Sequence, residues 1–374
     1  MKRVISIALL LVMALCMLTS CGASGEQSSD EPIKIGVSIW GVTDNQGALC
    51  KKYLDYAADA LGIELVYALN ASEADGVVNS MNNLIQAGCQ GIIVCNYSDG
   101  ELVSSIDVCE EAGVYLSQFF RTVSDPEMKA YVDKSPYFAG RVYEDEYNNG
   151  YNLAKIMADK GCKNVCLISY SHGDSVAETR YVGYTDAFRD FGINLLAEKW
   201  EISKSEDAAA AMETFMAAYP EMDGVAIVGV TESLGGVMSA VEAAGKTGDY
   251  VVVSTDFIPT LEDDIANGRV SAMAGGHEMD PVYSLLINYN AITGGFSADQ
   301  LPVELEYPYV NVADLSDVSD YFKYFEGDIP ALDADEIRAL TKQYNPNFKL
   351  SDLQQAVANM SVADARERHA HYFE

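Results

Sequence analysis

The sequence is poor in basic residues. It has 24 Lys and Arg against 56 Asp and Glu, which gives a formal net charge of −32 at pH 7. Proteins that bind nucleic acids or anionic lipid surfaces use clustered positive charge to do so. The charge balance therefore argues against nucleic acid as a partner and against electrostatic adhesion to a membrane.

The spacings typical of metal centres and enzymes are also missing. No two cysteines form a CxxC pair, and no set of His and Cys completes a zinc site. There is no G-x-S-x-G segment, and Gly245-Lys246-Thr247 lacks the upstream glycine of a phosphate loop. We therefore predict no catalytic residue, no metal and no cofactor, and we expect that the protein is not an enzyme.

The cysteines give little information about redox state. Most are expected to be small buried side chains, namely Cys50, Cys89, Cys95, Cys109, Cys162 and Cys166. A disulfide between Cys89 and Cys109, or between Cys162 and Cys166, stays open, because sequence alone does not reveal pairing.

Long apolar runs are absent after the first 20 residues. The run from Val4 to Leu18 is shorter than the ~20 residues of a membrane-spanning helix, and Lys2 and Arg3 precede it. This pattern is typical of a secretory signal. The following Leu18-Thr19-Ser20-Cys21 resembles a bacterial lipobox, which implies cleavage before Cys21 and a lipid on its thiol. An ordinary signal peptide that contains Cys21 is the alternative.

The remaining chain alternates between short apolar runs and helical periods. Residues 21–32 are small and polar, which predicts a flexible tether. Strands are predicted at 33–39, 63–69, 91–95, 114–119, about 138–143, 164–169, 194–200, 224–230, 250–255, 270–275 and 303–310. The intervening segments have a helical period, and several end at a glycine (Gly62, Gly88, Gly113, Gly192, Gly245). Two such series predict an α/β protein with two doubly wound parallel-sheet lobes.

The loops that follow the predicted strands carry the candidate binding residues. Ligands of open parallel sheets lie beyond the carboxyl ends of the strands. The candidates there are Trp40, Asp44, Asn45, Asn96, Gln118, Phe119, Arg121, Asp145, His172, Asp174, Glu178, Glu232, Asp256 and His277. Carboxylates and amides accept hydrogen bonds from hydroxyls, and aromatic rings stack on the apolar face of a sugar ring. This mixture favours a sugar or another polyol, with Trp40 and Asp256 as the strongest candidates.

The order of these segments resembles the type I periplasmic binding proteins, in the ribose-binding branch of sugar ABC-transporter receptors. The resemblance runs from about Lys34 to Leu305. The segments that carry it are Lys34–Val37, Ala87–Val94, Asp145–Gly150, Gly183-Tyr184, Val252–Asp256 and Pro302–Leu305. It implies two lobes joined by three hinge crossings, near residues 144–146, 275–279 and 302–305. The implied lobes are residues 33–144 with 280–310, and residues 145–279.

The sequence departs from the family pattern at several binding positions. Where the family often has an Asp-Arg pair after the fourth strand, this chain has Gln118 and Phe119, with Arg121 displaced. A family arginine in the next lobe corresponds to Glu178, and the nearby Arg180 is its candidate substitute. The resemblance therefore implies the fold without naming the ligand. Residues 311–374 lie beyond it, and we expect acidic helices that pack on the lobes.

The signal segment and the lipobox-like residues predict an exported protein that is lipid-anchored to the outer face of a bacterial cytoplasmic membrane, and we expect a monomer. The resemblance implies its role. Such a protein captures a small polar ligand, most simply a sugar, and delivers it to the permease of an ABC transporter. A sensory receptor subunit with the same fold is the alternative function. Glycoside hydrolysis is a less favoured one, because it needs two carboxylates that face one bond.

Overall fold

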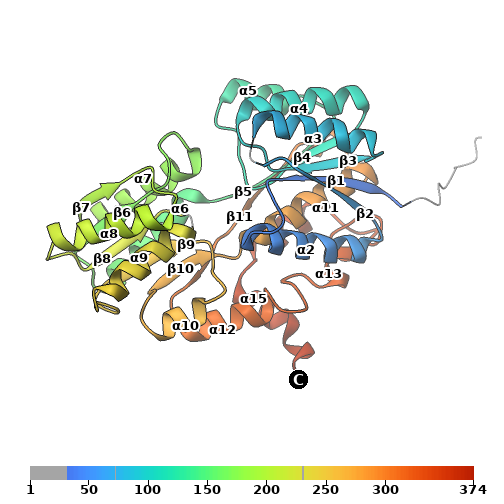
Figure 1. Ribbon diagram of the computed structural model, residues 1–374. Helices are drawn as coiled ribbons and strands as arrows, with labels where there is room; N and C mark the ends of the chain where they lie inside the picture. Colours follow the sequence, from blue (N-terminus) through green and yellow to red (C-terminus); the bar gives the residue numbers. More distant parts are fainter. Residues whose placement is uncertain (1–31, 72, 230) are drawn as a thin grey trace, which may run out of the picture. The chain divides into compact units, whose positions relative to one another are not determined.

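The computed structural model describes residues 32–71, 73–229 and 231–374. Residues 33–374 form one compact unit that contains two six-stranded sheets (Figure 1). The predicted signal peptide at 1–20 and the predicted lipid site at Cys21 lie outside the described residues. Within the described residues, none of the helices is both long and apolar enough to cross a membrane.

The first lobe is built on a parallel sheet with the strand order β11-β5-β4-β3-β1-β2. Its strands are β1 (Lys34–Ile39), β2 (Glu64–Leu69), β3 (Gly91–Val94), β4 (Tyr115–Gln118), β5 (Phe138–Glu144) and β11 (Val303–Tyr307). Helices α3 (Ala74–Gln86), α4 (Asp99–Ala112) and α5 (Pro126–Val132) cover one face, and α2 (Asn45–Leu61) and α11 (Asp280–Ile292) cover the other. Burial on both faces explains why the central strands are continuous apolar runs.

The second lobe repeats this arrangement in the strand order β12-β10-β9-β8-β6-β7. Its strands are β6 (Asn164–Ile168), β7 (Asn194–Lys199), β8 (Gly224–Ile227), β9 (Val251–Thr255), β10 (Ala272–Gly275) and β12 (Val310–Val312), of which β12 is antiparallel to β10. Its helices are α6 (Glu146–Asp159), α7 (Ser175–Phe191), α8 (Ser205–Ala218), α9 (Thr231–Ala243) and α10 (Leu261–Ala266). The predicted α/β fold with two parallel-sheet lobes is therefore confirmed.

The predicted glycine ends of helices are confirmed as well. Gly62, Gly113 and Gly192 cap α2, α4 and α7 in the left-handed conformation, with φ between 67° and 71°. A residue with a Cβ atom would be strained there, so each glycine allows the chain to leave its helix and enter the next strand.

The last predicted strand differs from the structure. The sequence pattern predicted one strand over 303–310, but the chain divides there into β11 in the first sheet and β12 in the second. Pro308 lies between them, and a proline cannot donate a hydrogen bond to a sheet. The third crossing therefore lies at residues 308–309, beyond the predicted 302–305, and Val310 belongs to the second sheet.

The region after β12 is helical, as expected. It contains α12 (Leu315–Tyr324), α13 (Ala334–Ala339), α14 (Leu350–Ala358) and α15 (Val362–His369). Its buried side chains, among them Val318, Tyr321, Ile337 and Leu353, belong to the same apolar core as α2, α11, α8 and α9. The region thus packs on both lobes.

The first lobe also contains a fully buried arginine. Arg141 on β5 pairs with Glu304 on β11 and with Asp133, which follows α5. Lys129 contacts the same two carboxylates from a more exposed position, at 2.7 and 2.5 Å. The guanidinium therefore joins a helix to two neighbouring strands next to the first crossing.

We expect Arg141→Met to lower the free energy of unfolding by about 3 kcal/mol, because it leaves two partly buried carboxylates without their main partner. Lys129→Met is the matched control, and we expect it to cost less than about 1 kcal/mol because its ammonium group is more exposed. Urea unfolding measures both values. Equal losses in the two variants would contradict the assigned role of Arg141.

Candidate functional site

A cavity of about 290 Å³ lies between the two lobes, at the carboxyl ends of strands from both sheets. Trp40 follows β1, Cys95 follows β3, Tyr170 lies just beyond β6 and Asp256 follows β9. The complete lining is Trp40, Gln46, Cys95, Asn96, Tyr97, Phe120, Arg121, Glu144, Glu146, Tyr170, Val176, Arg180, Asp256, His277 and Tyr309. The cavity has the position that open α/β sheets use for ligands.

An aromatic wall forms the side of the cavity that belongs to the first lobe. The ring centroids of Trp40 and Phe120 are 5.8 Å apart, and the His277 ring lies 5.5 Å from Phe120. Phe120 has φ 60°, a value that is costly for a residue with a Cβ atom. This turn places Phe120 in the cavity wall directly after β4 has ended.

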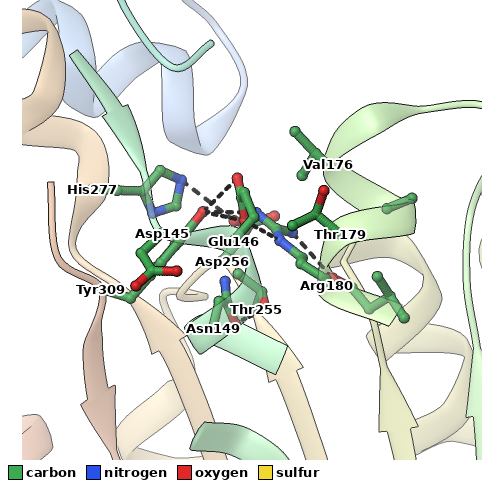
Figure 2. Close-up of polar contacts among 12 residues, drawn as sticks. Asp145, Glu146, Asn149, Val176, Thr179, Arg180, Thr255, Asp256, His277 and Tyr309 are labelled. Atoms are coloured by element: carbon green, nitrogen blue, oxygen red, sulfur yellow. Dashed lines mark hydrogen bonds and ion pairs between the residues drawn. The ribbon is translucent and has the colours of Figure 1, made fainter. Parts of the chain in front are cut away.

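A hydrogen-bonded network fixes the opposite wall. Arg180 Nε donates to Glu146 Oε2 at 2.6 Å, its Nη2 donates to the Tyr309 hydroxyl at 2.7 Å, and its Nη1 donates to the Val228 carbonyl at 3.0 Å. Figure 2 shows Glu146 and Asp256 between Arg180 on one side and His277 and Tyr309 on the other. Because its donors are engaged, Arg180 acts chiefly to hold this wall in place.

Two glycines allow Arg180 to reach Glu146. A Cβ atom at Gly150 in α6 would lie 2.1 Å from the Arg180 carbonyl oxygen, and one at Gly183 in α7 would lie 2.1 Å from the Tyr147 carbonyl oxygen. Both distances are far inside van der Waals contact. The pair of glycines thus permits the close approach of α6 and α7.

Asp256 is the most accessible carboxylate of the second-lobe wall. Its side chain is 25% exposed, and its Oδ1 lies 3.5 Å from His277 Nε2. Its φ of 72° places a non-glycine residue in the left-handed region, where the strain costs of order 1–3 kcal/mol. Strained residues of this kind are concentrated at binding and active sites. Its exposure and its strained backbone make Asp256 a candidate binding residue.

Arg121 lines the cavity from the first lobe, where Glu144 is one of the charged groups that raise its pKa. One of its amino groups, Nη1, donates to the Phe120 carbonyl at 2.9 Å. Among the ion pairs between described residues, none involves Arg121. Its remaining N–H groups are thus suited to donate to a ligand.

A buried carboxyl pair lies below this wall. Glu144 lines the cavity, Asp280 lies behind it, and each has an oxygen without a hydrogen-bond donor among the described residues. Burial raises the pKa of both groups well above their ordinary values. Burial therefore disfavours negative charge on both carboxyl groups.

The cavity lining includes six of the residues predicted from the sequence, Trp40, Asn96, Arg121, Arg180, Asp256 and His277. The two polar ends of Asn96 are already engaged, since its Oδ1 accepts from Gln118 at 2.7 Å and its Nδ2 donates to the Ser98 carbonyl at 2.9 Å. That these residues bind a ligand stays a prediction.

Two predicted residues lie in the core behind the cavity. Gln118 and Phe119 are fully buried, and Gln118 supports Asn96. Strand β4 extends to Gln118, and Phe119 belongs to the apolar core and not to the cavity lining. The neighbouring Phe120 replaces Phe119 as the aromatic residue of the lining.

Three predicted carboxylates cap helices instead of lining the cavity. Asp44, Asp145 and Asp174 accept hydrogen bonds from backbone N–H groups in the first turns of α2, α6 and α7. An acidic residue between a strand and a helix is favoured at the N-cap. The same sequence signal therefore marks a helix cap as well as a binding residue.

The other predicted residues lie outside the lining too. His172 stacks on Trp200 with ring centroids 3.9 Å apart and pairs with Glu178 at 3.1 Å, and Glu232 is exposed. The Nδ2 of Asn45 donates to the Phe257 carbonyl at 3.1 Å, so this side chain joins the two lobes at the rim.

Several lining residues are not among the predicted ones. Gln46 lies in the first turn of α2, and its Nε2 donates to His277 Nε2 at 2.6 Å. Tyr309 lies in the third crossing, in a segment whose apolar pattern predicted an uninterrupted strand. Pro308 is the signal that could have placed this crossing.

The region after β12 contains a cluster of residues of the types that can bind a metal ion. It comprises Asp333, Glu336 and His369. Asp333 caps α13 and accepts a hydrogen bond from Tyr372, while Glu336 accepts from Arg368 and contacts His369 at 2.9 Å. The carboxylates of Asp333 and Glu336 and the Nε2 atom of His369 are thus engaged within this region, which indicates a structural role.

All six cysteines of the described residues are buried free thiols. This agrees with the expectation of small buried side chains. Neither Cys89–Cys109 nor Cys162–Cys166 forms a disulfide.

His277 and Glu278 are adjacent, and burial moves their pKa values in opposite directions. Burial lowers the pKa of His277 to about 4 and raises the pKa of Glu278 to about 7. Unfolded His takes up a proton below about 6.5, so His277 reduces the stability of the fold as the pH falls from about 6.5 to 4. Glu278 has the opposite effect, because its folded form retains a proton that the unfolded form loses.

We expect His277→Gln to remove the first of these effects. Relative to wild type, the free energy of unfolding of the variant should rise by about 2 kcal/mol between pH 7 and pH 5. Glu278→Gln should change it in the opposite direction over the same range. Urea unfolding at the two pH values measures both, and parallel pH curves for all three proteins would contradict the assignment.

Comparison with known proteins agrees with this architecture. The family model described as "Periplasmic binding protein domain" matches residues 35–280. A xylitol-binding protein of Mycolicibacterium smegmatis is 25% identical over 69% of this chain and 74% of its own. A D-allose-binding periplasmic protein of Escherichia coli is 26% identical over 62% of this chain and 75% of its own.

Solved structures show the same fold. An ABC-transporter periplasmic solute-binding protein of Actinobacillus succinogenes with bound D-allose has a TM-score of 0.68 and 19% identity, over 77% of this chain and 100% of its own. A solute-binding protein of Bacillus halodurans with bound myo-inositol has a TM-score of 0.64 and 17% identity, over 79% of this chain and 98% of its own. With its two lobes, three crossings and inter-lobe cavity, the chain belongs to the periplasmic binding protein family.

Proposed function

We propose that this protein captures a sugar or related polyol in the cavity between its lobes and delivers it to the permease of an ABC transporter. The observation that carries the proposal is the set of free polar groups in the cavity. Asp256 offers an acceptor from one lobe and Arg121 offers donors from the other, beside the aromatic wall of Trp40 and Phe120. Hydroxyls both donate and accept, so a polyol satisfies both groups.

The ligands of the relatives support a neutral, hydroxyl-rich molecule. The relatives bind xylitol, D-allose or myo-inositol, which are all small and uncharged. In this chain, Glu146 is paired with Arg180, and burial raises the pKa of Glu144 and Asp280 well above their ordinary values, which disfavours charge on them. The remaining charges, on Arg121 and Asp256, are opposite in sign. The cavity therefore favours a ligand without net charge.

Capture requires motion of the lobes about the three crossings. A ligand that contacts both walls binds the closed form more tightly than the open form, and it therefore shifts the population toward closure. Asn45, which joins the lobes at the rim by its bond to Phe257, would separate on opening. The permease would then distinguish the closed form from the open one.

We propose that no chemical step accompanies capture. Hydrolysis of a glycoside needs two available carboxyl groups on either side of the bond. Here Glu146 is engaged by Arg180 and Tyr309, and Glu144 is paired with Asp280. Asp256 is then the carboxylate that remains available in the lining.

We further propose that the protein is an exported monomer, anchored to the outer face of the cytoplasmic membrane by a lipid on Cys21. The family is consistent with a location outside the cytoplasm. The support for the anchor is the sequence Leu18-Thr19-Ser20-Cys21 after a short apolar run.

We expect D-allose, xylitol or myo-inositol to raise the melting temperature in a concentration-dependent manner, because a ligand that binds only the folded state stabilises it. Asp256→Ala should weaken the affinity by about 10- to 100-fold, since a hydrogen bond to a charged group contributes about 1.5–3 kcal/mol. Thermal shift and calorimetry measure these effects.

Glu232→Ala is the matched control, because it removes an exposed carboxylate that does not line the cavity. Shifts caused by amino acids alone would contradict the ligand class. Undiminished binding by a folded Asp256→Ala variant would show that the site lies elsewhere.

We expect Cys21→Ser to release the protein from membranes, because it removes the thiol that would carry the lipid. Partition between detergent and aqueous phases of Triton X-114 measures the change. Cys16→Ser is the control, since that thiol precedes the proposed cleavage site. Identical partition of wild type and the Cys21→Ser variant would rule out the anchor.

A further inference from the structure

Residues 314–374, which we name the C-terminal strap, extend beyond the family match. The family model ends at residue 280, and the Actinobacillus succinogenes structure is covered completely by 77% of this chain. The strap is nevertheless well packed, and its buried residues join one apolar core that contains residues of both lobes. Its position therefore requires an explanation beyond the shared fold.

The first helix of the strap is attached to the second lobe. Helix α12 follows β12, and Ser319 Oγ donates to Glu262 Oε1 of α10 at 2.7 Å. The Tyr321 ring packs edge-on against Phe257, with centroids 4.5 Å apart. Phe257 directly follows Asp256 of the cavity lining, so α12 lies behind one rim of the candidate site.

The remainder of the strap is attached to the first lobe. Lys52 in α2 donates to the carbonyls of Glu326 and Gly327, at 2.6 and 2.9 Å. Arg338 Nε donates to the Ala60 carbonyl at 2.9 Å, and the Tyr344 hydroxyl donates to the Leu61 carbonyl at 2.7 Å. The strap therefore changes lobe at residues 325–327, immediately after α12.

The two parts of the strap also hold each other. Arg366 in α15 pairs with Asp320 in α12 at 2.8 Å. The Lys323 ammonium lies 4.5 Å from the centre of the Phe373 ring, and the Tyr324 ring packs edge-on against Phe373 at 5.2 Å. Rotation of one lobe against the other must therefore shear α12 against α15.

Helix α12 also contacts the second crossing directly. A Cβ atom at Gly276 would lie 3.3 Å from the Tyr321 ring, so the ring covers the backbone where the chain leaves β10. The strap is thus placed both at the pivot and across the two bodies that turn about it.

We propose that the C-terminal strap restrains the opening of the lobes and so raises the population of the closed form before any ligand binds. The proposal rests on the hinge motion of the proposed function. Each link from the strap to a lobe that must break on opening stabilises the closed form relative to the open one. A protein that is partly closed in advance loses less of its binding free energy to closure.

The test uses the ligand-free protein with spin labels on opposite lobes. A ketone-bearing amino acid at Glu111 in α4 and Glu213 in α8, both exposed, accepts the labels without involving the native thiols. Lys52→Ala combined with Arg366→Ala removes two exposed links of the strap. We expect the ratio of open to closed protein to rise about tenfold in the distance distribution.

The matched control is Lys155→Ala combined with Arg189→Ala, which removes exposed ion pairs confined to the second lobe. We expect the wild-type distance distribution for it. An unchanged distribution in the folded Lys52→Ala/Arg366→Ala variant would overturn the proposal. If that double variant does not fold, the two single variants are measured in its place, because each changes a largely exposed side chain. An unchanged distance distribution in both folded single variants would likewise overturn the proposal.

The distances also separate this proposal from the proposed function. D-allose, xylitol or myo-inositol could bind and move the lobes equally in wild type and in the strap variants. That result would refute the proposed role of the strap and leave the proposed function standing. Conversely, the strap variants could open more widely in the absence of ligand while none of these polyols binds. That result would support the proposed role of the strap and refute the proposed ligand class.

Discussion

The pairing of Arg180 with Glu146 and Tyr309 is the interaction on which the candidate site depends most. Glu146 is the first residue of α6 and directly follows the first crossing, and Tyr309 lies in the third crossing. One buried guanidinium therefore fixes two crossings and one cavity wall at the same time. The group is positioned by α7, whose close packing on α6 depends on two glycines. Removing one partner of such a buried pair would leave an uncompensated charge.

Charge compensation also explains how so acidic a protein maintains a cavity suited to a neutral molecule. Glu146 has a basic partner, burial raises the pKa of Glu144, and burial lowers the pKa of His277 to about 4. The donation from Gln46 to His277 Nε2 agrees with a neutral imidazole, because it requires that nitrogen to be unprotonated. The net charge of the chain therefore resides mainly on its surface.

The sequence predicted the fold better than the site, for a physical reason. Apolar runs and glycine helix ends depend on local chemistry, so the lobes and the helix ends at Gly62 and Gly113 could be predicted. Whether a carboxylate after a strand caps the next helix, as Asp174 does, or faces the cavity, as Asp256 does, depends on a backbone turn of one residue. The position of Tyr309 depends on the fact that the segment before Pro308 joins the first sheet and the segment after it joins the second. The periodicity of apolar residues does not indicate which sheet a strand joins.

The contact between α6 and α7 has a mechanical consequence. Because Gly150 and Gly183 bring the two helix backbones together, there is little room for these helices to slide past each other. Helix α6 starts where the first crossing ends. A small change of backbone dihedral angles in that crossing therefore rotates α6 and α7 together as one rigid body. The far end of the second lobe then sweeps through a longer arc than the residues next to the pivot.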